Sequence, residues 1–415
     1  MYIDKDSFMC YSLSRKREGK MNIEIFTLAS TKEGYEAPQE EFDRIAGHTA
    51  GICYLPSMDP NKLLSEPDER TKRRIALIKG SGHHSTFDHE SRTYLISGLP
   101  KIIAMILNNQ RFYTTSEKSA RYTLMPLEGE EGELFNKWKE IFQNEIREQW
   151  QEKRPQWFDD RKVLKLAQEN ARYLTSVFTP TAMAYTVSYR QYNVLHSLLE
   201  DEMERLSKLD DNFSKRLSLA IEEFLTACDK QIPLLDQDLS ANKKGRHLSF
   251  LDKRPVEEYF GDVYATSYMG SLAQFAQAQR HRTLTYGLIM PKDGEESFYV
   301  PPILKSKPEL VTMWLADCNS LKNNYPQGLL VRINERGNTE DFLLKVQERN
   351  CSCAQLEIDQ QTTETKIKMY KELKAKNNDH AEELEPFLVG SRCMGGYKCD
   401  SPCGFPEGIT GTRNI

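Results

Sequence analysis

The sequence predicts an α+β fold made of two units in tandem. Segments with the 3.6-residue apolar period of helices alternate with short β-rich runs. The 415 residues are more than one ordinary hydrophobic core uses. A weak internal repeat points the same way, because 110–114 lines up with 281–285, and 180–199 with 326–349. We expect each unit to hold a small mixed or antiparallel sheet packed with long helices.

The first unit should begin with a strand at Met21 and continue with a helix over 40–53. A β-rich run then leads into a helix in which Leu99, Ile102 and Ile106 share one face. Gly98 and Pro100 mark that helix start. The remaining elements expected in this unit are a strand at 92–97 and helices at 129–153, 161–177 and 191–230, the last broken near 210–211.

The second unit should begin near Val263, after a polar stretch rich in Gly and Pro. We expect a helix of small residues over 268–282, an extended segment at 298–304 and helices over 338–375. The predicted division of the chain is an extension at 1–20, a first unit at 21–236, a linker at 237–262, a second, shorter unit at 263–390 and a Cys- and Gly-rich tail at 391–415.

Composition indicates a globular protein without a strong charge bias. The chain carries 56 basic and 61 acidic residues, for a net charge of −5. This argues against nucleic acid as a partner, since such proteins show a basic footprint. No apolar run approaches the roughly 20 residues that span a bilayer. With no signal-peptide pattern near Met1, we expect a cytoplasmic protein whose nine cysteines are reduced.

Cysteines in the tail leave two interpretations open. Cys393, Cys399 and Cys403 could bind zinc together with a fourth ligand, but only the second of their two spacings is typical of zinc sites. A tail with thiols and no metal is the favoured interpretation.

Four clusters could carry chemistry. The segment 82–89 holds three histidines and Asp88, which suits metal binding, acid–base catalysis or a simple polar loop. The segment 111–122 places hydroxyls and Glu117 between two arginines, which suits a phosphate or a solvated turn. The other two are 277–282, a basic helix end, and 338–358, where an arginine and polar residues interrupt an apolar rhythm.

Together these clusters resemble the flavin-dependent thymidylate synthase family. That family has a His-x-Ser/Thr-x-x-Glu-His segment, and then a helix ending in Arg-His-Arg that is followed by Glu, Ser, Arg and Tyr. In the first half, the matching residues are His83, Ser85, Asp88, His89, Arg111, Glu117, Ser119, Arg121 and Tyr122, with Arg172, Ser188 and Arg190 further on. Asn109 and Gln110 replace the first two residues of the triplet, and Leu199 replaces the last nucleotide arginine.

The second half resembles the family in the complementary positions. Its matching residues are Gln277, Arg280, His281, Arg282, Asn338 and Arg349, with the run Ala354-Gln355-Leu356-Glu357-Ile358. Leu288, Met290 and Lys292 replace the Glu, Ser and Arg that follow the triplet. Each half therefore keeps what the other lacks, which predicts pockets built from both.

The resemblance implies methylation of dUMP to dTMP with FAD, NADPH and 5,10-methylenetetrahydrofolate, in a homodimer that mimics the family's tetramer. The implied nucleotide-binding residues are Glu117, Ser119, Arg121, Arg172, Gln277, Arg280 and Arg349, of which Arg280 and Arg349 are also implied to be catalytic. The implied flavin-binding residues are His83, Ser85, Asp88, Arg111, Arg190, Arg280, His281, Arg282 and Asn338. No metal is implied. The alternatives are a flavoenzyme that alkylates another pyrimidine nucleotide, and a flavin- or nucleotide-binding protein without catalysis.

Overall fold

The fold is described from a computed structural model of the 415-residue chain. The described residues are 21–25, 39–52, 55, 61–121, 123–150, 158–231, 235–240, 247–351, 353–391, 393–396, 398 and 413–415. The predicted extension at 1–20, Tyr122, and two of the three tail cysteines, Cys399 and Cys403, lie outside these ranges.

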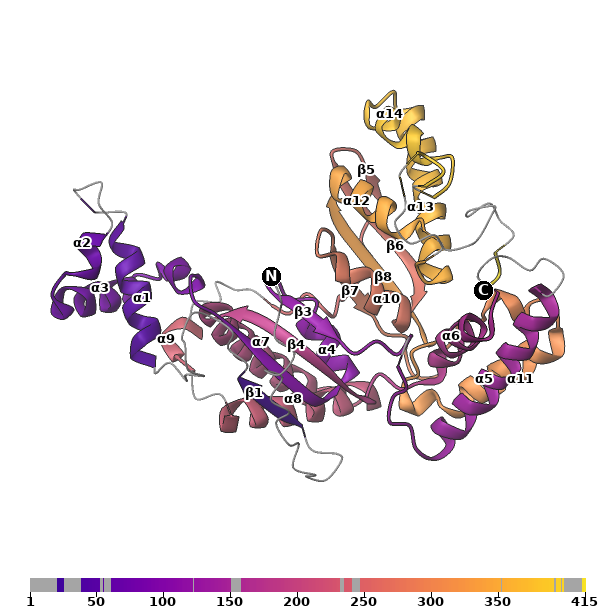
Figure 1. Cartoon of the computed structure of the whole chain (residues 1–415), viewed down its shortest axis with the longest axis horizontal. Coiled ribbons are helices and arrows are strands. Elements are labelled where there is room, and N and C mark those ends of the chain that lie inside the picture. The colour runs from indigo at the N-terminus through magenta and orange to yellow at the C-terminus, as the bar shows by residue number, and fades with distance from the viewer. Residues whose placement is uncertain are drawn as a thin grey trace, which may run out of the picture.

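The first sheet is antiparallel and has the strand order β1-β2-β4-β3. Its strands are β1 (Asn22–Ile25), β2 (Ser91–Pro100), β3 (Thr114–Glu117) and β4 (Pro180–Ser188). Helices α4 (Lys101–Leu107), α7 (Tyr189–Ser207) and α8 (Asn212–Gln231) pack with it (Figure 1). Because every residue of α4 from Ile102 to Leu107 is buried, this short helix is part of the core rather than of the surface.

The second sheet is also antiparallel, with the order β5-β6-β8-β7. Its strands are β5 (Tyr259–Phe260), β6 (Val263–Ser271), β7 (Thr285–Ile289) and β8 (Leu330–Asn338), and its helices are α10 (Leu272–Ala278), α12 (Thr339–Arg349) and α13 (Leu356–Ala375). The predicted fold class is confirmed: the chain is α+β, with two small antiparallel sheets that fit two units in tandem.

The other helices form two groups outside the sheets (Figure 1). Helices α1 (Gln39–Gly51), α2 (Asn61–Leu64) and α3 (Asp68–Gly80) lie at one end, on the side of α9 (Gln237–Ser240). At the other end α5 (Gly129–Trp150) and α6 (Asp160–Ala171) lie beside α11 (Pro308–Ser320) of the second half. Trp138 and Trp314 meet there edge to face at 4.8 Å, so the two halves share this part of the core.

The strands of the two halves correspond in register. Thr114 stands opposite Thr186 in the first sheet, as Thr285 stands opposite Arg336 in the second. Ser188 and Asn338 each end a strand and cap the following helix by accepting a backbone N–H three residues on. First-half positions from 99 to 121 are therefore 171 below their counterparts, and those from 172 to 199 are 150 below.

An approximate two-fold axis relates the halves where they touch. Ser176 and Pro326, which are counterparts, face each other in an isolated antiparallel bridge. On either side Val177 N donates to Tyr325 O at 3.0 Å, and Gln327 N donates to Thr175 O at 2.8 Å. Contacts that repeat with the roles exchanged are the mark of an isologous interface.

Some expected elements differ from those observed. The helix predicted over 268–282 is wrong at its start, because Tyr268–Ser271 pair with β8 and only α10 and the turn η4 (Gln279–His281) are helical. The helix predicted over 338–375 is interrupted between α12 and α13, and the extended segment 298–304 ends in the 3-10 turn η5 (Pro302–Leu304). The short strands β3 and β7, and helices α3 and α11, were not anticipated. α14 (His380–Leu384) and η7 (Glu385–Phe387) follow α13.

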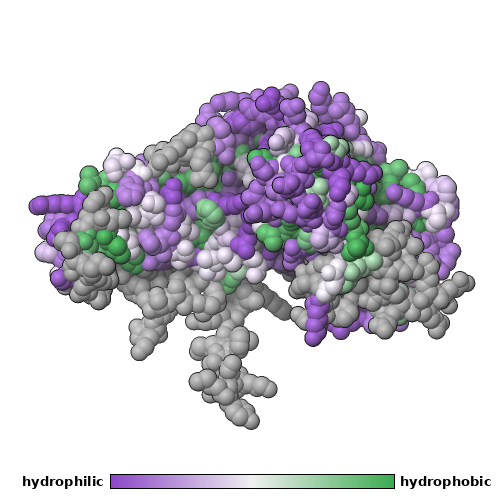
Figure 2. All heavy atoms as spheres, turned by 90° about the horizontal axis from the view of Figure 1, so that it is seen from above, coloured by the Kyte–Doolittle hydropathy of each residue, from purple (hydrophilic) through white to green (hydrophobic). Residues whose placement is uncertain are grey.

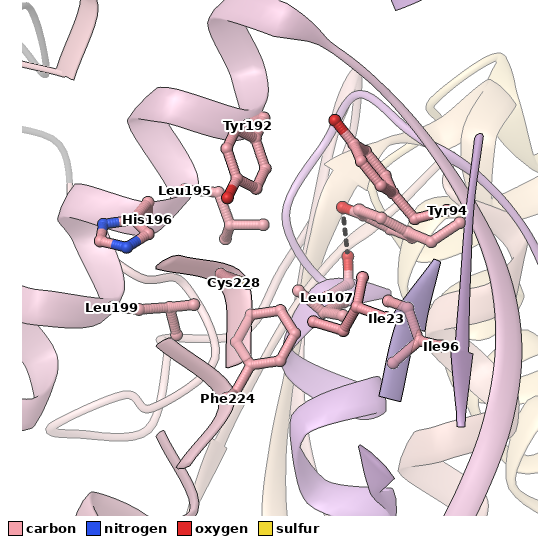
Figure 3. A pocket seen from close by; sticks show the side chains of 11 residues that line it. Ile23, Tyr94, Ile96, Leu107, Tyr192, Leu195, His196, Leu199, Phe224 and Cys228 are labelled. Atoms are coloured by element: carbon pink, nitrogen blue, oxygen red, sulfur yellow. Dashed lines mark hydrogen bonds between the residues drawn. The ribbon is translucent and has the colours of Figure 1, made fainter. Parts of the chain in front are cut away.

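Beneath the first sheet lies a small apolar cavity of about 20 Å³ (Figure 3). Tyr94 and Ile96 line it from β2, Tyr192 from α7, and Phe224 and Cys228 from α8. Burial raises the pKa of the Cys228 thiol to about 12. The cavity holds no more than a water molecule, so we regard it as a packing gap.

The face shown in Figure 2 is mainly hydrophilic, with smaller hydrophobic areas between. Within the described ranges, no helix is both long and apolar enough to cross a membrane.

Candidate functional site

One pocket, of about 200 Å³, lies between the two halves. First-half residues Glu117, Ser119 and Arg121 form part of its wall, and Arg172 lies deeper. Gln277 and Arg280 come from the second half. Six of the seven residues predicted to bind the nucleotide are thus brought together. The other residues that line the pocket are Lys101, Lys118, Ala120, Met125, Thr175, Thr179, Ala273, Ala276 and Gln327.

Glu117, at the end of β3, connects the halves electrostatically. Its side chain is only 5% exposed, and Lys101 Nζ donates to its Oε1 at 2.6 Å. Asn108 Nδ2 and Arg280 Nη1 donate to its Oε2, at 3.1 and 3.3 Å. Because one carboxylate holds two cations from different halves, Glu117 fixes where the Arg280 guanidinium enters the pocket.

Two first-half arginines are fixed by contacts that cross to the loop after α12. Arg121 Nε lies 3.0 Å from Glu169 Oε2, and its Nη2 donates to Cys353 O at 3.0 Å. Arg172 is buried, and its Nη2 donates to Gln355 Oε1 at 2.6 Å. Desolvation lowers the pKa of Arg172, but an arginine remains charged at neutral pH.

Arg349, the seventh predicted nucleotide residue, lies behind the pocket wall. Its Nη2 donates to the carbonyl oxygen of Gln277 at 3.1 Å. Burial above all, together with the charges of Arg121 and Arg280, lowers the pKa of Arg349 to about 10. Arg349 therefore adds positive potential to the pocket without lining it.

Buried polar atoms at the pocket lack hydrogen-bond partners among the described residues. They include Arg172 Nε, Gln277 Oε1 and Arg349 Nε. Since buried polar groups are nearly always satisfied, such atoms indicate a place where a polar ligand or water belongs. With four arginines, two lysines and two carboxylates nearby, the arrangement suits an anion that also offers hydrogen-bond donors.

The arginines of the two triplets make reciprocal contacts along the outer edges of β3 and β7. Arg282 Nη1 donates to Tyr113 O at 2.7 Å, and its counterpart Arg111 donates to Leu284 O, the counterpart of Tyr113. Likewise, Arg280 Nη2 donates to Thr115 O at 3.3 Å. Arg282 is in the left-handed region at φ 58°. The arginines of both triplets therefore join the two halves through hydrogen bonds to backbone carbonyl oxygens.

A separate group forms at the opposite end of the first sheet. Asp88, in the turn η2 (His84–Asp88), accepts from Ser188 Oγ at 2.6 Å and from Arg190 Nη1 at 2.5 Å. Gln191 Nε2 donates to Arg111 O at 2.7 Å, which links this group to the triplet. Asp88 and Arg190 are thus adjacent, as expected of residues that share one ligand.

The other predicted flavin residues are more dispersed. His83 and Ser85 are exposed beside Asp88, and Asn338 is exposed at the end of β8, where it caps α12. The backbone of His281 is in η4, and its side chain lies outside what is described. Hence the predicted flavin residues do not line one common cavity in the part of the chain that the structure describes.

Sequence reasoning missed the residues that hold the motif residues in place. Lys101 and Asn108 bind Glu117, and Glu169 binds Arg121. Their positions carry no local signal, because only the tertiary fold brings them to the motif residues: Lys101 and Glu169 from helices, and Asn108 from the turn after α4. No group of three or more His, Cys, Asp or Glu able to hold a metal occurs among the described residues, including the 82–89 segment.

The sequence itself supplies the relationship to known proteins. Residues 37–203 match the family model described as "Thymidylate synthase complementing protein". Over these residues the chain resembles the flavin-dependent thymidylate synthase family. The resemblance predicted from His83, Ser85, Glu117 and Arg121 is thereby confirmed. None of the curated proteins compared matches the chain.

Two solved structures of enzymes show low similarity to the chain. The UMP/dUMP methylase PolB from Streptomyces cacaoi bound with 5-Br dUMP is 14% identical, with 54% of this chain and 96% of that chain covered and a TM-score of 0.32. Thymidylate Synthase X from Helicobacter pylori with FAD and dUMP is 20% identical, with 54% and 97% covered and a TM-score of 0.26. TM-scores this low add nothing about the arrangement of the present chain.

Proposed function

We propose that the chain catalyses flavin-dependent reductive methylation of dUMP to dTMP, with methylenetetrahydrofolate as carbon donor and NADPH as reductant. The observation that carries the proposal is the pocket between the halves. It brings Glu117, Ser119 and Arg121, which only the first half retains, to Gln277 and Arg280, which only the second retains. In this proposal the halves are two diverged copies of one unit, divided near 237–262.

The nucleotide phosphate would bind Arg121 and Ser119, since a guanidinium fork and a hydroxyl match phosphate oxygens. Gln277 presents an unpaired buried Oε1, which can accept from the imide N–H of the uracil ring. Arg280, held by Glu117, and Arg349, behind Gln277, would stabilise negative charge as it develops on the ring at C5 attack.

The residues also fit a flavin in part. Arg190, which binds Asp88, and Thr115, whose carbonyl oxygen accepts from Arg280, have a buried Nε and a buried Oγ1 without partners among the described residues. Reduced FAD would supply the hydride, and Arg111, Arg190, Arg280 and Arg282 would hold its phosphates and ring.

The dispersed residues support the proposal of a homodimer. His83, Ser85 and Asn338 are exposed within one chain. A second copy could bring them to a shared flavin site. A particle with twice the mass of the chain, measured by light scattering, would agree with this arrangement, whereas a monomer that binds FAD would contradict it.

The test of function is direct. Purified protein supplied with dUMP, methylenetetrahydrofolate, FAD and NADPH should form dTMP, detected by mass spectrometry. UMP, dCMP and CMP offered in parallel distinguish an enzyme for another pyrimidine nucleotide. A yellow protein that binds dUMP without turnover would instead be a binding protein, and a colourless protein that forms no product would contradict the proposal.

The pocket arginine offers a matched comparison. Arg121→Ala should weaken dUMP binding by about 10- to 100-fold, because a hydrogen bond to a charged group contributes about 1.5–3 kcal/mol. Arg161→Ala removes the same charge from an exposed position on α6 and should leave the dissociation constant unchanged. Equal losses in both variants would mean that net charge, not the pocket, governs binding.

A further inference from the structure

The correspondence between the halves requires a second place equivalent to the nucleotide pocket. Its walls would be the counterparts of Glu117, Gln277 and Arg280. These counterparts are Leu288, Ile106 and Asn109. Leu288 and Ile106 are at most 1% exposed, so the charged and polar lining of the first pocket is replaced there by core side chains.

Another part of the chain occupies this second place. Residues 249–252 run alongside β7, and Leu251 forms a parallel bridge with Leu288. Leu288 N donates to Phe250 O at 2.9 Å, and Asp252 N donates to Leu288 O at 2.8 Å. The segment thus uses the backbone groups of Leu288, whose counterpart, Glu117, borders the nucleotide pocket.

Side chains of residues 249–252 make further contacts with α10, with Asn109 and with β8. The Phe250 side chain is 1% exposed and meets Phe275 of α10 edge to face at 5.4 Å. Ser249 Oγ donates to Asn109 Oδ1 at 2.6 Å. Asp252 accepts from Asn334 Nδ2 at 2.7 Å and from Arg336 Nη2 at 2.6 Å.

The residues that replaced the basic triplet take part in this anchoring. Asn109 and Gln110 stand where the second half has Arg280 and His281. Gln110 Nε2 donates to Ser249 Oγ at 3.0 Å, and Asn109 Nδ2 donates to Tyr286 O at 2.9 Å.

We infer that residues 249–252 are a built-in plug of the second pocket, so that each chain binds one nucleotide and not two. The stoichiometry rests on the proposed function, whereas the plug itself does not. The plug follows from the burial of Phe250 and from the backbone bonds to Leu288. Because the uncharged Leu288 and Asn109 stand where the first pocket has Glu117 and Arg280, displacing the plug would not restore a phosphate site.

Two measurements on the full chain test this inference. Hydrogen exchange should show the Leu288 and Asp252 amides protected to the same degree as those in the middle of β8. Ser249→Ala should speed exchange at Leu288 several-fold, whereas Ser207→Ala, whose hydroxyl bonds only to Glu204 O within α7, should not. Unprotected amides in the wild-type chain would overturn the plug.

Equilibrium dialysis with dUMP gives the second measurement. Saturation at one nucleotide per chain is expected, and saturation at two would overturn the inference while leaving the proposed function intact. No binding together with protected amides would reject the proposed function and keep the plug. The two failures are therefore distinguishable.

Discussion

At the scale of single residues, corresponding buried positions of the two halves hold side chains of different chemical character. In the second half Lys345 and Glu335 form an ion pair with both side chains 0% exposed, and the carboxylate also accepts from Tyr264 and Tyr268. The first-half counterparts are Leu195 and Tyr185, which are apolar or neutral and also buried. Burial lowers the pKa of Lys345, so its charge depends on Glu335.

This pair gives a stability prediction. Lys345→Met should lower the free energy of unfolding by about 3–5 kcal/mol, because it leaves the Glu335 carboxylate buried without a cation. The double variant with Glu335→Gln should recover much of that loss, since neither charge then remains. Denaturant titration measures both, and a double variant as unstable as the single one would contradict the explanation.

A second residue prediction concerns Glu117. Glu117→Gln removes the charge that holds Lys101 and Arg280. We expect the dUMP dissociation constant to rise about tenfold, because Arg280 loses its orientation even though the pocket becomes more positive. Tighter binding in this variant would show that net charge matters more than the position of Arg280.

At the scale of elements, Arg74 of α3 binds both the backbone of α1 and the Glu66 carboxylate in the turn before α3. Arg74 donates from Nη1 to Glu66 Oε1 at 2.5 Å and from Nη2 to Oε2 at 2.8 Å, and it also reaches Gly47 O at 2.7 Å. The bond with Arg74 is the largest cause that lowers the pKa of Glu66, from 4.5 to about 2. A bidentate pair with one member 5% exposed is of the stronger kind.

The sign of the pH effect follows from that shift. Because the folded pKa lies below the unfolded one, Glu66 stabilises the helices fully above pH 4.5 and loses this effect as the pH falls towards 2. The hydrogen-exchange protection factors of α3, which are corrected for the intrinsic rate at each pH, should fall over that window. Glu66→Gln should abolish the dependence, while Glu69→Gln, whose side chain is 76% exposed, should not.

Sequence reasoning found helices such as α5, α7 and α8, but it missed the short strands β3 and β7 and the helices α3 and α11. The split between α7 and α8 was expected from Asp210 and Asp211. In contrast, β3 and β7 have only four and five residues and depend on pairing with β4 and β8. The start of the predicted 268–282 helix contains small residues that also suit a strand, and tertiary pairing decided between them.

At the scale of the whole molecule, motif residues of both halves line one pocket. The sequence could indicate that Arg280 and Glu117 belong together, because each half lacked one of them. It could not indicate Lys101 or Gln355, or the plug at 249–252. Those contacts join residues that only the tertiary fold brings together, and no local pattern encodes them.

The bridge between Ser176 and Pro326 has a consequence for how this interface can change. In a dimer of identical subunits, the residue on the axis meets a copy of itself, and every substitution is made twice. Here a serine faces a proline, which has no N–H to donate. Joining the halves in one polypeptide lets each side of the contact vary alone, so a change that would be harmful in duplicate can be accepted singly.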